Sequence, residues 1–290
     1  MTTAREWYEG ARPRTLGAAV APVLVGTAAA SLDGPIVWWR AAAALAVALA
    51  LQVGVNYAND YSDGIRGTDT ERRGPLRLTA TGTATPTAVR RAAIISFGTA
   101  AVVGGVLSLV VNPWLLLVGA ASIAAAALYT GGPKPYGYHG FGEVAVLVFF
   151  GLVATVGSAY VQHETIPAEA WLGAFAVGLL ACALLVVNNL RDIETDLVAG
   201  KKTLAVRIGR AATQDLYTLS IAGAFVAVVV IGILRPPALL ALAALPLSIT
   251  PVRIVRARHA DAKSLVAALI ATSRLELVVA VLLAIGLVVA

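Results

Sequence analysis

The sequence predicts an all-α, multi-pass membrane protein, on the evidence of its composition, its long apolar runs and its small side chains. Hydrophobic residues make up 59% of the chain and charged residues 13%, which is about half the charged share of an ordinary soluble domain. Aromatic residues contribute only 7%, and Ala, Val, Leu and Gly dominate. This composition favours helices packed through small side chains over a barrel of alternating residues.

Apolar runs long enough to cross a hydrocarbon core of about 30 Å, roughly 17 to 25 residues each, recur along nearly the whole chain. We expect nine transmembrane helices in one domain over residues 1–290. The first run follows Arg12 and Arg14, as a signal peptide would, but the next comes after a short turn, so we expect it to remain in the bundle. The expected spans are 15–31, 36–58, 88–110, 113–130, 141–161, 167–190, 213–234, 237–255 and 264–289.

The basic residues sort to one side of the expected bundle. Of the 22 Lys and Arg residues, all but Arg40, Arg235 and Arg274 lie before the first span, in the loops after the even-numbered spans, or within the span ends that adjoin those loops. Loops rich in Lys and Arg stay on the cytoplasmic side of a membrane. We therefore expect a cytoplasmic N-terminus in the plasma membrane, and we attribute the net charge of +6 to topology rather than to nucleic-acid binding.

Two polar, acidic stretches lie at the cytoplasmic ends of the second and sixth expected spans. Their members are Asn56, Asn59, Asp60, Asp63 and Asp69 in NYANDYSDGIRGTD, and Asn188, Asp192 and Asp196 in NNLRDIETD. Ionisable residues are costly near a bilayer and persist mainly where they line a water-filled cavity, pair with each other or hold ions. A solvated helix end with arginine counterions explains a single acid better than it explains two matching clusters.

Helical spacing puts the members of each cluster on one face. Asn188, Asp192 and Asp196 stand at i, i+4 and i+8, and a comparable stripe runs from Asn56 at i, i+4 and i+7. Like charges one turn apart repel, so a cation is expected between them. Oxygen ligands without nearby Cys or His favour Mg²⁺, which takes few protein carboxylates and completes its shell with water and phosphate oxygens. Two facing clusters predict two Mg²⁺ ions that clamp a diphosphate.

Basic residues beside the clusters suit the anionic oxygens that metals would leave uncovered, although some of them serve topology only. The candidates are Arg66, Arg72, Arg73, Arg191, Lys201 and Arg207. The order of apolar helix, acidic cluster and basic loop occurs twice. It predicts two halves, approximately 1–135 and 136–290, that face each other across a central cavity.

Four segments of the chain carry a family resemblance. They are NYANDYSDGIRGTD, then GPLRL, then YTGGPKPYGYHGFGE over Tyr129–Glu143, and finally NNLRDIETDLVAGKKTLAVRIG. The first and last resemble the two aspartate motifs of the UbiA-type polyprenyl aromatic prenyltransferases. Together the four resemble the menaquinone-pathway branch of that family, and they extend over nearly the whole chain.

The resemblance implies a nine-helix enzyme that transfers a polyprenyl chain from polyprenyl diphosphate to 1,4-dihydroxy-2-naphthoate, with loss of CO₂, to give demethylmenaquinone. Its Mg²⁺ ions would be held by Asp60, Asp63, Asp192 and Asp196. Asn56 and Asn188 would ligate or orient metal and diphosphate, with Asn59 beside the substrate. The prenyl tail would enter from membrane lipid into an apolar tunnel that excludes water.

The segment after the fourth span supplies further candidates. A tyrosine face at Tyr129 can stabilise a cation, and Lys134 can bind a carboxylate, whereas interfacial anchoring is the plainer role for such residues. His139 is a candidate ring-deprotonating base or a solvent-facing loop residue. Asp69 departs from the ubiquinone-pathway pattern because it follows Asp63 by six residues, so it is a metal ligand, a loop cap or an arginine partner.

Other functions fit parts of the sequence. The same site could use 4-hydroxybenzoate or homogentisate as the acceptor. An ion transporter would use acids in a midplane pore, whereas these acids lie at helix ends among basic loops. CDP-alcohol phosphotransferases also use intramembrane aspartates, but the DGxxAR block expected there is absent from the sequence. Neither the prenyl chain length nor the oligomeric state follows from these residues.

Overall fold

The computed structural model of the chain describes residues 2–67 and 76–290, and every regular element within those ranges is helical. This confirms the all-α fold class. The elements are α1 (Ala4–Gly10), η1 (Pro13–Thr15), α2 (Gly17–Ala30), α3 (Trp38–Arg66), α4 (Pro86–Val111), α5 (Leu115–Leu128), η2 (Tyr136–His139), α6 (Gly142–Val146), η3 (Leu147–Val153), α7 (Ala154–His163), α8 (Ala168–Val198), α9 (Leu204–Leu234), η4 (Pro236–Ser248), α10 (Ile249–Arg256) and α11 (Ala262–Val288).

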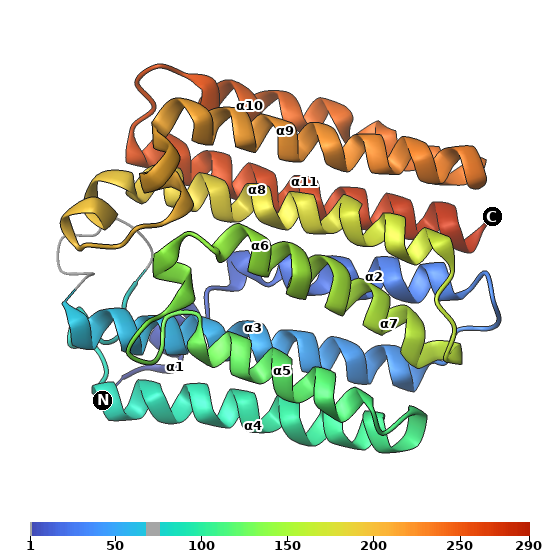
Figure 1. The fold of residues 1–290 in the computed structure, drawn as a ribbon, viewed down its shortest axis with the longest axis horizontal. Helices are drawn as coiled ribbons and strands as arrows, with labels where there is room; N and C mark the ends of the chain where they lie inside the picture. Colours follow the sequence, from blue (N-terminus) through green and yellow to red (C-terminus); the bar gives the residue numbers. More distant parts are fainter. Residues whose placement is uncertain (1, 68–75) are drawn as a thin grey trace.

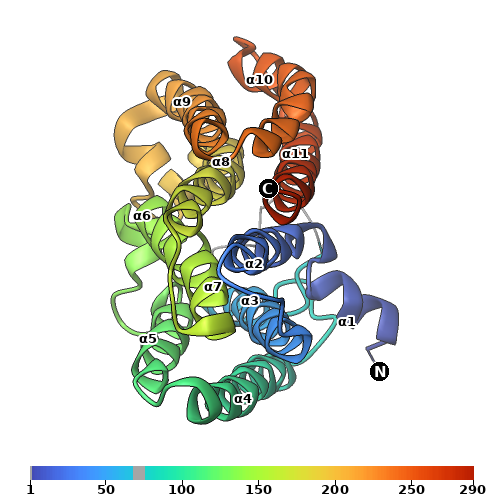
Figure 2. The same ribbon diagram turned by 90° about the vertical axis from the view of Figure 1, so that its right-hand side faces the viewer.

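The long helices run side by side, and the two chain ends lie at opposite ends of the bundle (Figure 1). Seen along the helices, α8 packs against α9 and α11, α3 packs against α4, and α2 packs against both α7 and α11 (Figure 2). Helix α8 is the centre of the core, because 67% of its most apolar window is buried, a larger share than in any other long apolar helix of the described residues. Side chains on α8 are therefore held firmly.

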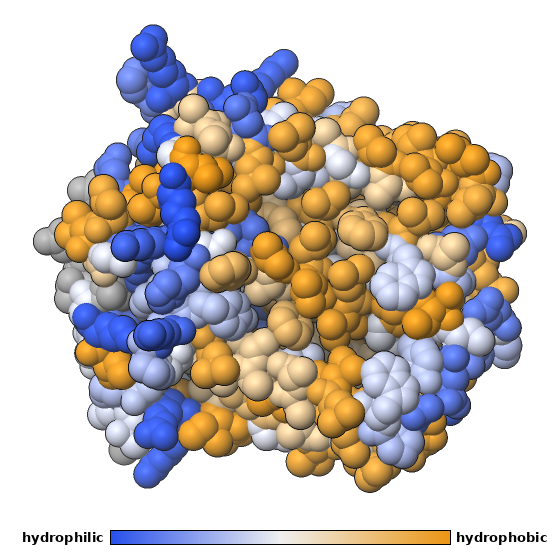
Figure 3. Space-filling view, viewed as in Figure 1, coloured by the Kyte–Doolittle hydropathy of each residue, from blue (hydrophilic) through white to orange (hydrophobic). Residues whose placement is uncertain are grey.

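Within the described residues, seven helices are long and apolar enough to cross a membrane, and α2 and α5 are shorter apolar helices. Each of the nine expected spans overlaps one of these helical segments. Hydrophobic side chains cover the middle of the visible surface, and hydrophilic ones gather at both ends, most heavily where α3 and α8 finish (Figure 3). The protein is thus a multi-pass membrane protein by the length and composition of its helices.

Two helices extend further than the apolar pattern predicts. Helix α3 runs to Arg66 and stops at Gly67, whose φ of 70° is left-handed, and α8 runs to Val198. Apart from Asp69, which lies outside the described residues, both acidic clusters therefore lie toward the ends of regular helices rather than in loops. Helical geometry then fixes the direction of every side chain in them.

Two irregularities shape the helices beside the site. Leu147–Val153 forms a π-helical stretch between α6 and α7, where Gly151 approaches Gly178 of α8 so closely that added Cβ atoms would clash. Helix α9 bends at Gly209, whose φ is 78°. A π-helical turn changes the register of the residues that follow it, so it re-aims the side chains of α7.

The packing of α2 on α7 depends on Gly26. A Cβ atom added there would lie 2.1 Å from the Thr155 carbonyl oxygen, which belongs to backbone and cannot yield cheaply. We expect Gly26→Ala to lower the apparent melting temperature in detergent by several degrees, since overpacking costs about 1–3 kcal/mol. Gly98→Ala is the matched control, because nothing lies within 4 Å of its added Cβ. Equal melting temperatures for both variants would contradict this packing.

Candidate active site

A cavity of about 620 Å³ lies between α2, α3, α4, α5, α7 and α8. Most of its wall is apolar and built from small residues, including Ala100, Gly104, Gly105 and Gly119. Its polar residues come mainly from the helix ends that carry the acidic clusters and from the loops beside them: Arg12, Gln52, Asn56, Asn59, Asp63, Arg77, Tyr129, Thr130, Tyr138, Asn188, Asn189, Asp196 and Lys201. One cavity therefore has a polar end formed by these residues, which we call the charged head, and an apolar extension.

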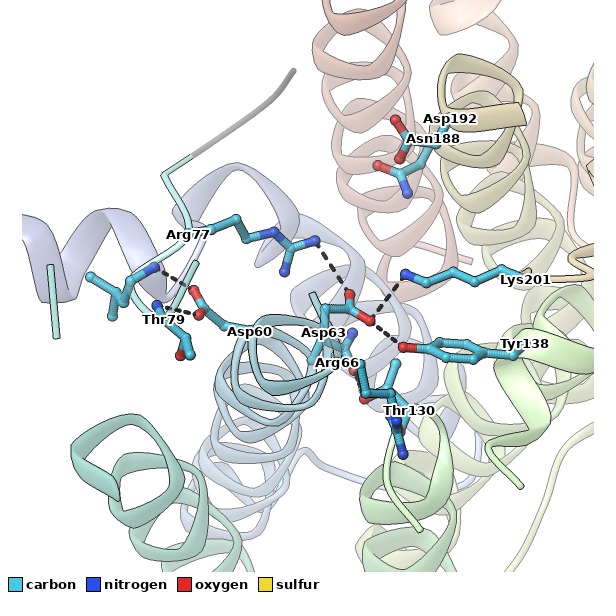
Figure 4. Close-up of polar contacts among 12 residues, drawn as sticks. Asp60, Asp63, Arg66, Arg77, Thr79, Thr130, Tyr138, Asn188, Asp192 and Lys201 are labelled. Atoms are coloured by element: carbon cyan, nitrogen blue, oxygen red, sulfur yellow. Dashed lines mark hydrogen bonds and ion pairs between the residues drawn. The ribbon is translucent and has the colours of Figure 1, made fainter. Parts of the chain in front are cut away.

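Asp63 is the centre of the charged head (Figure 4). Its carboxylate is buried, at 3% exposure, so the charge depends on its neighbours. Lys201 Nζ lies 3.0 Å from Oδ1, the Tyr138 hydroxyl donates to the same oxygen, and Arg77 Nη2 lies 3.8 Å from Oδ2. These contacts bring the end of α3, the segment after α5 and the loop after α8 to one point.

Lys201 is positioned by the backbone as well as by its charge. Its N–H donates to the carbonyl oxygen of Asp196 at 2.8 Å, and its ammonium lies 4.7 Å from the centre of the Tyr138 ring. Burial, and then the charge of Asp63, raise the pKa of Tyr138 well above its ordinary value. The phenol therefore keeps its proton at neutral pH and acts as a donor.

Asn59 and Arg66 fix the turn that follows α5. The Thr130 hydroxyl donates to Asn59 Oδ1 at 2.7 Å. The Arg66 guanidinium donates to the carbonyl oxygens of Thr130 and Gly132 and lies 5.5 Å from the Tyr138 ring centre. Arg66, expected beside the substrate, thus clamps the turn that carries the site's tyrosines.

Asp60 points away from the cavity. Its two carboxylate oxygens accept hydrogen bonds from the backbone N–H groups of Leu78 and Thr79, each at 2.8 Å, and it is 1% exposed. It does not line the cavity. The i, i+4 stripe that faces the cavity runs through Asn59 and Asp63 instead, and Asp60 anchors the chain that leads into α4.

The second cluster divides in a similar way. Arg191 donates to both oxygens of its neighbour Asp192, at 2.7 and 2.6 Å, and to Asn188 Oδ1 at 2.9 Å. Asn188 and Asp196 line the cavity. Arg191 thus supplies the countercharge for the buried Asp192 carboxylate, whereas Asp196 lines the same cavity as Asp63.

Asn56 links the cavity to the N-terminal segment. Its Nδ2 donates to the Ala11 carbonyl oxygen at 2.8 Å and to the Thr15 hydroxyl at 3.1 Å. Gln52, one turn away on α3, also donates to that hydroxyl at 3.1 Å. These bonds hold the turn at Arg12, which adopts a left-handed conformation and lines the cavity.

Other predicted residues fall elsewhere. Tyr129 lines the cavity and meets the Tyr136 ring edge to face. Lys134 is exposed and does not line the cavity, and His139 is exposed with Nδ1 2.8 Å from the Pro135 carbonyl oxygen. Arg72 and Asp69 lie outside the described residues. Tyr138, which contacts Asp63, and Asn189, which lines the cavity, were not singled out from the sequence, although the doubled asparagine in NNLRD was a signal.

The donor set suits a hard cation completed by substrate. In the described part of the chain, no three Asp, Glu, His or Cys side chains converge closely enough to enclose a metal ion. Residues with carboxylate and amide oxygens line one cavity from α3 and α8. Beside Asp63, the positive charge that a metal ion would supply comes from the Lys201 ammonium. That arrangement fits Mg²⁺, which prefers oxygen ligands and shares substrate phosphates.

Comparisons with solved structures support the fold. A UbiA homologue from Archaeoglobus fulgidus bound to GPP and Mg²⁺ has a TM-score of 0.66 at 15% identity, covering 96% of this chain and 99% of that chain. The apo structure of a UbiA homologue from Aeropyrum pernix K1 has a TM-score of 0.67 at 14% identity, covering 94% of this chain and 97% of that chain.

Sequence comparisons agree with this fold. The 1,4-dihydroxy-2-naphthoate octaprenyltransferase of Mycobacterium tuberculosis is 52% identical over 88% of this chain and 88% of its own. The protein of the same name from Escherichia coli is 41% identical over 76% of this chain and 74% of its own. The UbiA prenyltransferase family profile matches residues 19–273. The chain therefore belongs to the UbiA prenyltransferase family.

Proposed function

We propose that this enzyme transfers a polyprenyl group from polyprenyl diphosphate to 1,4-dihydroxy-2-naphthoate, with loss of CO₂, and so makes the hydroquinone form of demethylmenaquinone. The observation that carries the proposal is the single cavity that joins a charged head to a long apolar wall. A prenyl diphosphate has the same two parts. Bacterial relatives 41–52% identical to this chain bear the name of this reaction, which supports naphthoate over 4-hydroxybenzoate or homogentisate as the acceptor.

The charged head would bind the diphosphate. Asp63, Asp192 and Asp196 would hold Mg²⁺ with Asn56 and Asn188, and two ions bridging the diphosphate match the two clusters. When bound, Mg²⁺ supplies positive charge that stabilises the departing diphosphate. We assign Asp60 a positioning role, because both of its oxygens accept hydrogen bonds from backbone N–H groups. The oxygens of Asp192 are held by the Arg191 side chain instead, which can turn away when a metal binds.

Lys201 and Arg77 lie where they can act both in the metal-free site and in the site with metal and diphosphate bound. Here they compensate the Asp63 carboxylate. Once Asp63 binds a metal, the same cations can contact diphosphate oxygens, which they suit as charged donors. The protonated Tyr138 hydroxyl orients the carboxylate, and its ring supports the Lys201 ammonium.

The reaction would follow from these positions. The allylic C–O bond breaks and its electron pair leaves with the diphosphate. The ring carbon that bears the carboxylate bonds to the allylic cation, and the pair of the broken C–CO₂ bond then restores the aromatic ring. Tyr129 lines the cavity and offers a π-face that stabilises positive charge, and the apolar wall excludes water that would quench the cation.

We also propose the membrane orientation. The charged head, the basic loops and the N-terminus would face the cytoplasm, and nine helices would span the plasma membrane once the shorter α2 and α5 are counted. Trp38, Trp39, Trp114 and Trp171 are partly or mostly exposed at the other end of these helices, where an aromatic belt would meet the opposite interface.

An assay of the purified protein tests the function. With Mg²⁺, geranylgeranyl diphosphate and 1,4-dihydroxy-2-naphthoate, we expect prenylated product and CO₂ by mass spectrometry, and pyrophosphate only when both substrates are present. Parallel reactions contain 4-hydroxybenzoate or homogentisate. Product from 4-hydroxybenzoate or homogentisate alone would assign the enzyme to a different pathway. Ion flux in proteoliposomes without any product would favour the transporter alternative.

The metal role of the clusters gives a second expectation. Asp63→Asn and Asp192→Asn should each lower kcat by at least about 100-fold, since metal assistance is worth several kcal/mol. Chelation by EDTA should abolish turnover of the wild type, and added Mg²⁺ should restore it. Near-normal activity in both variants, with membrane insertion unchanged, would contradict the two-metal arrangement.

Asp60 should behave differently from Asp63. Asp60→Ala leaves the buried N–H of Leu78 and the part-buried N–H of Thr79 unpaired, and an unpaired buried group costs about 1–3 kcal/mol, so we expect the apparent melting temperature to fall by several degrees. Asp60→Asn keeps one acceptor oxygen and should retain turnover within about tenfold once folded. If Asp60→Asn loses activity as completely as Asp63→Asn while melting normally, Asp60 is a metal ligand.

A further inference from the structure

Asn189 is a buried polar residue that the reaction as described leaves unused. It lies on α8 beside Asn188, lines the cavity and is 8% exposed. Its Nδ2 donates to Glu143 Oε1 of α6 at 3.0 Å. Glu143 is 9% exposed, and its Oε2 makes no hydrogen bond within the described residues.

Glu143 fixes which end of the Asn189 carboxamide is available. A carboxylate only accepts hydrogen bonds, so the NH₂ group of Asn189 must face it. Among the residues described, nothing donates to Asn189 Oδ1. The side chain therefore offers the cavity a carbonyl oxygen, an acceptor held in one orientation by a buried partner.

The position of Asn189 along the helix axis is where the aromatic ring of the acceptor would lie. Asn189 precedes Asp192 by three residues on α8, which is about 4.5 Å along the helix axis, on the side of the apolar wall. A ring attacked by C1 of a prenyl diphosphate must lie at this level, just beyond the charged head. Tyr129 and Leu185 lie against Gly142, next to Glu143, and both line the cavity beside Asn189.

We propose that Asn189, oriented by Glu143, accepts a hydrogen bond from a ring hydroxyl of the hydroxyaromatic acceptor and selects for acceptors that carry it. The inference rests on the proposed function and explains how the site recognises the aromatic acceptor. As the ring gives electrons to the allylic cation, its hydroxyl becomes a stronger donor. The bond to Asn189 therefore strengthens in the transition state and raises the rate as well as the affinity.

A substrate series separates this role from helix packing. We would measure binding and turnover of 1,4-dihydroxy-2-naphthoate, 1-hydroxy-2-naphthoate and 4-hydroxy-2-naphthoate in the wild type and in Asn189→Leu, which keeps the volume. The wild type should prefer the dihydroxy compound over one monohydroxy compound by about tenfold, the value of one hydrogen bond. In Asn189→Leu that preference should vanish while KM for the prenyl diphosphate stays unchanged. Asn112→Leu, at the opposite end of the bundle, is the control and should keep the preference.

Glu143 variants test the positioning role. Glu143→Leu should remove the same preference, Glu143→Gln should restore most of it, and the double variant Asn189→Leu with Glu143→Leu should be no worse than either alone. A preference that persists in Asn189→Leu, or equal loss for all three naphthoates together with a lower melting temperature, would overturn the inference. Equilibrium binding reports on Asn189 even where no acceptor is prenylated, so failure of the proposed function remains distinguishable.

Discussion

The buried carboxylate of Asp63 is the constraint on which the rest of the site depends. An ionised group in a low-dielectric interior is strongly unfavourable unless opposite charges and hydrogen bonds surround it. Lys201, Tyr138 and Arg77 meet this requirement from three segments that are far apart in the sequence. The contacts tie the loop after α8 and the turn after α5 to the end of α3. The polar end of the bundle is thus organised around one negative charge.

That organisation explains why the cavity has two characters. Long helices with small residues leave room between α4, α5 and α7, and nothing polar is needed there. At the other end, α3 and α8 continue beyond their apolar runs, so their carboxylates and amides remain on rigid helices. A ligand with an anionic head and an isoprenoid tail matches the charged and apolar parts of this one cavity. The aromatic acceptor would lie where the two parts meet.

Much of this could be predicted from the sequence. Apolar length and helical spacing report local properties, so the fold class, the overlap of helices with the expected spans and the two acidic clusters were all accessible. The roles within a cluster were not. Asp60 and Asp63 fit the same helical stripe, and only the chain that returns at Leu78 and Thr79 turns Asp60 away from the cavity. Arg191 and Lys134 were equally plausible anion ligands until burial and pairing separated them.

The central claim is that metal and diphosphate replace the protein's own cations around Asp63, and diffraction tests it most directly. Crystals grown with Mn²⁺ and geranylgeranyl thiodiphosphate would be measured at the manganese absorption edge. The account predicts two manganese peaks between Asp63 and the α8 carboxylates, with Lys201 Nζ moved from Asp63 to the diphosphate. An occupied diphosphate with no manganese at Asp63, and an intact contact between Lys201 and Asp63, would contradict it.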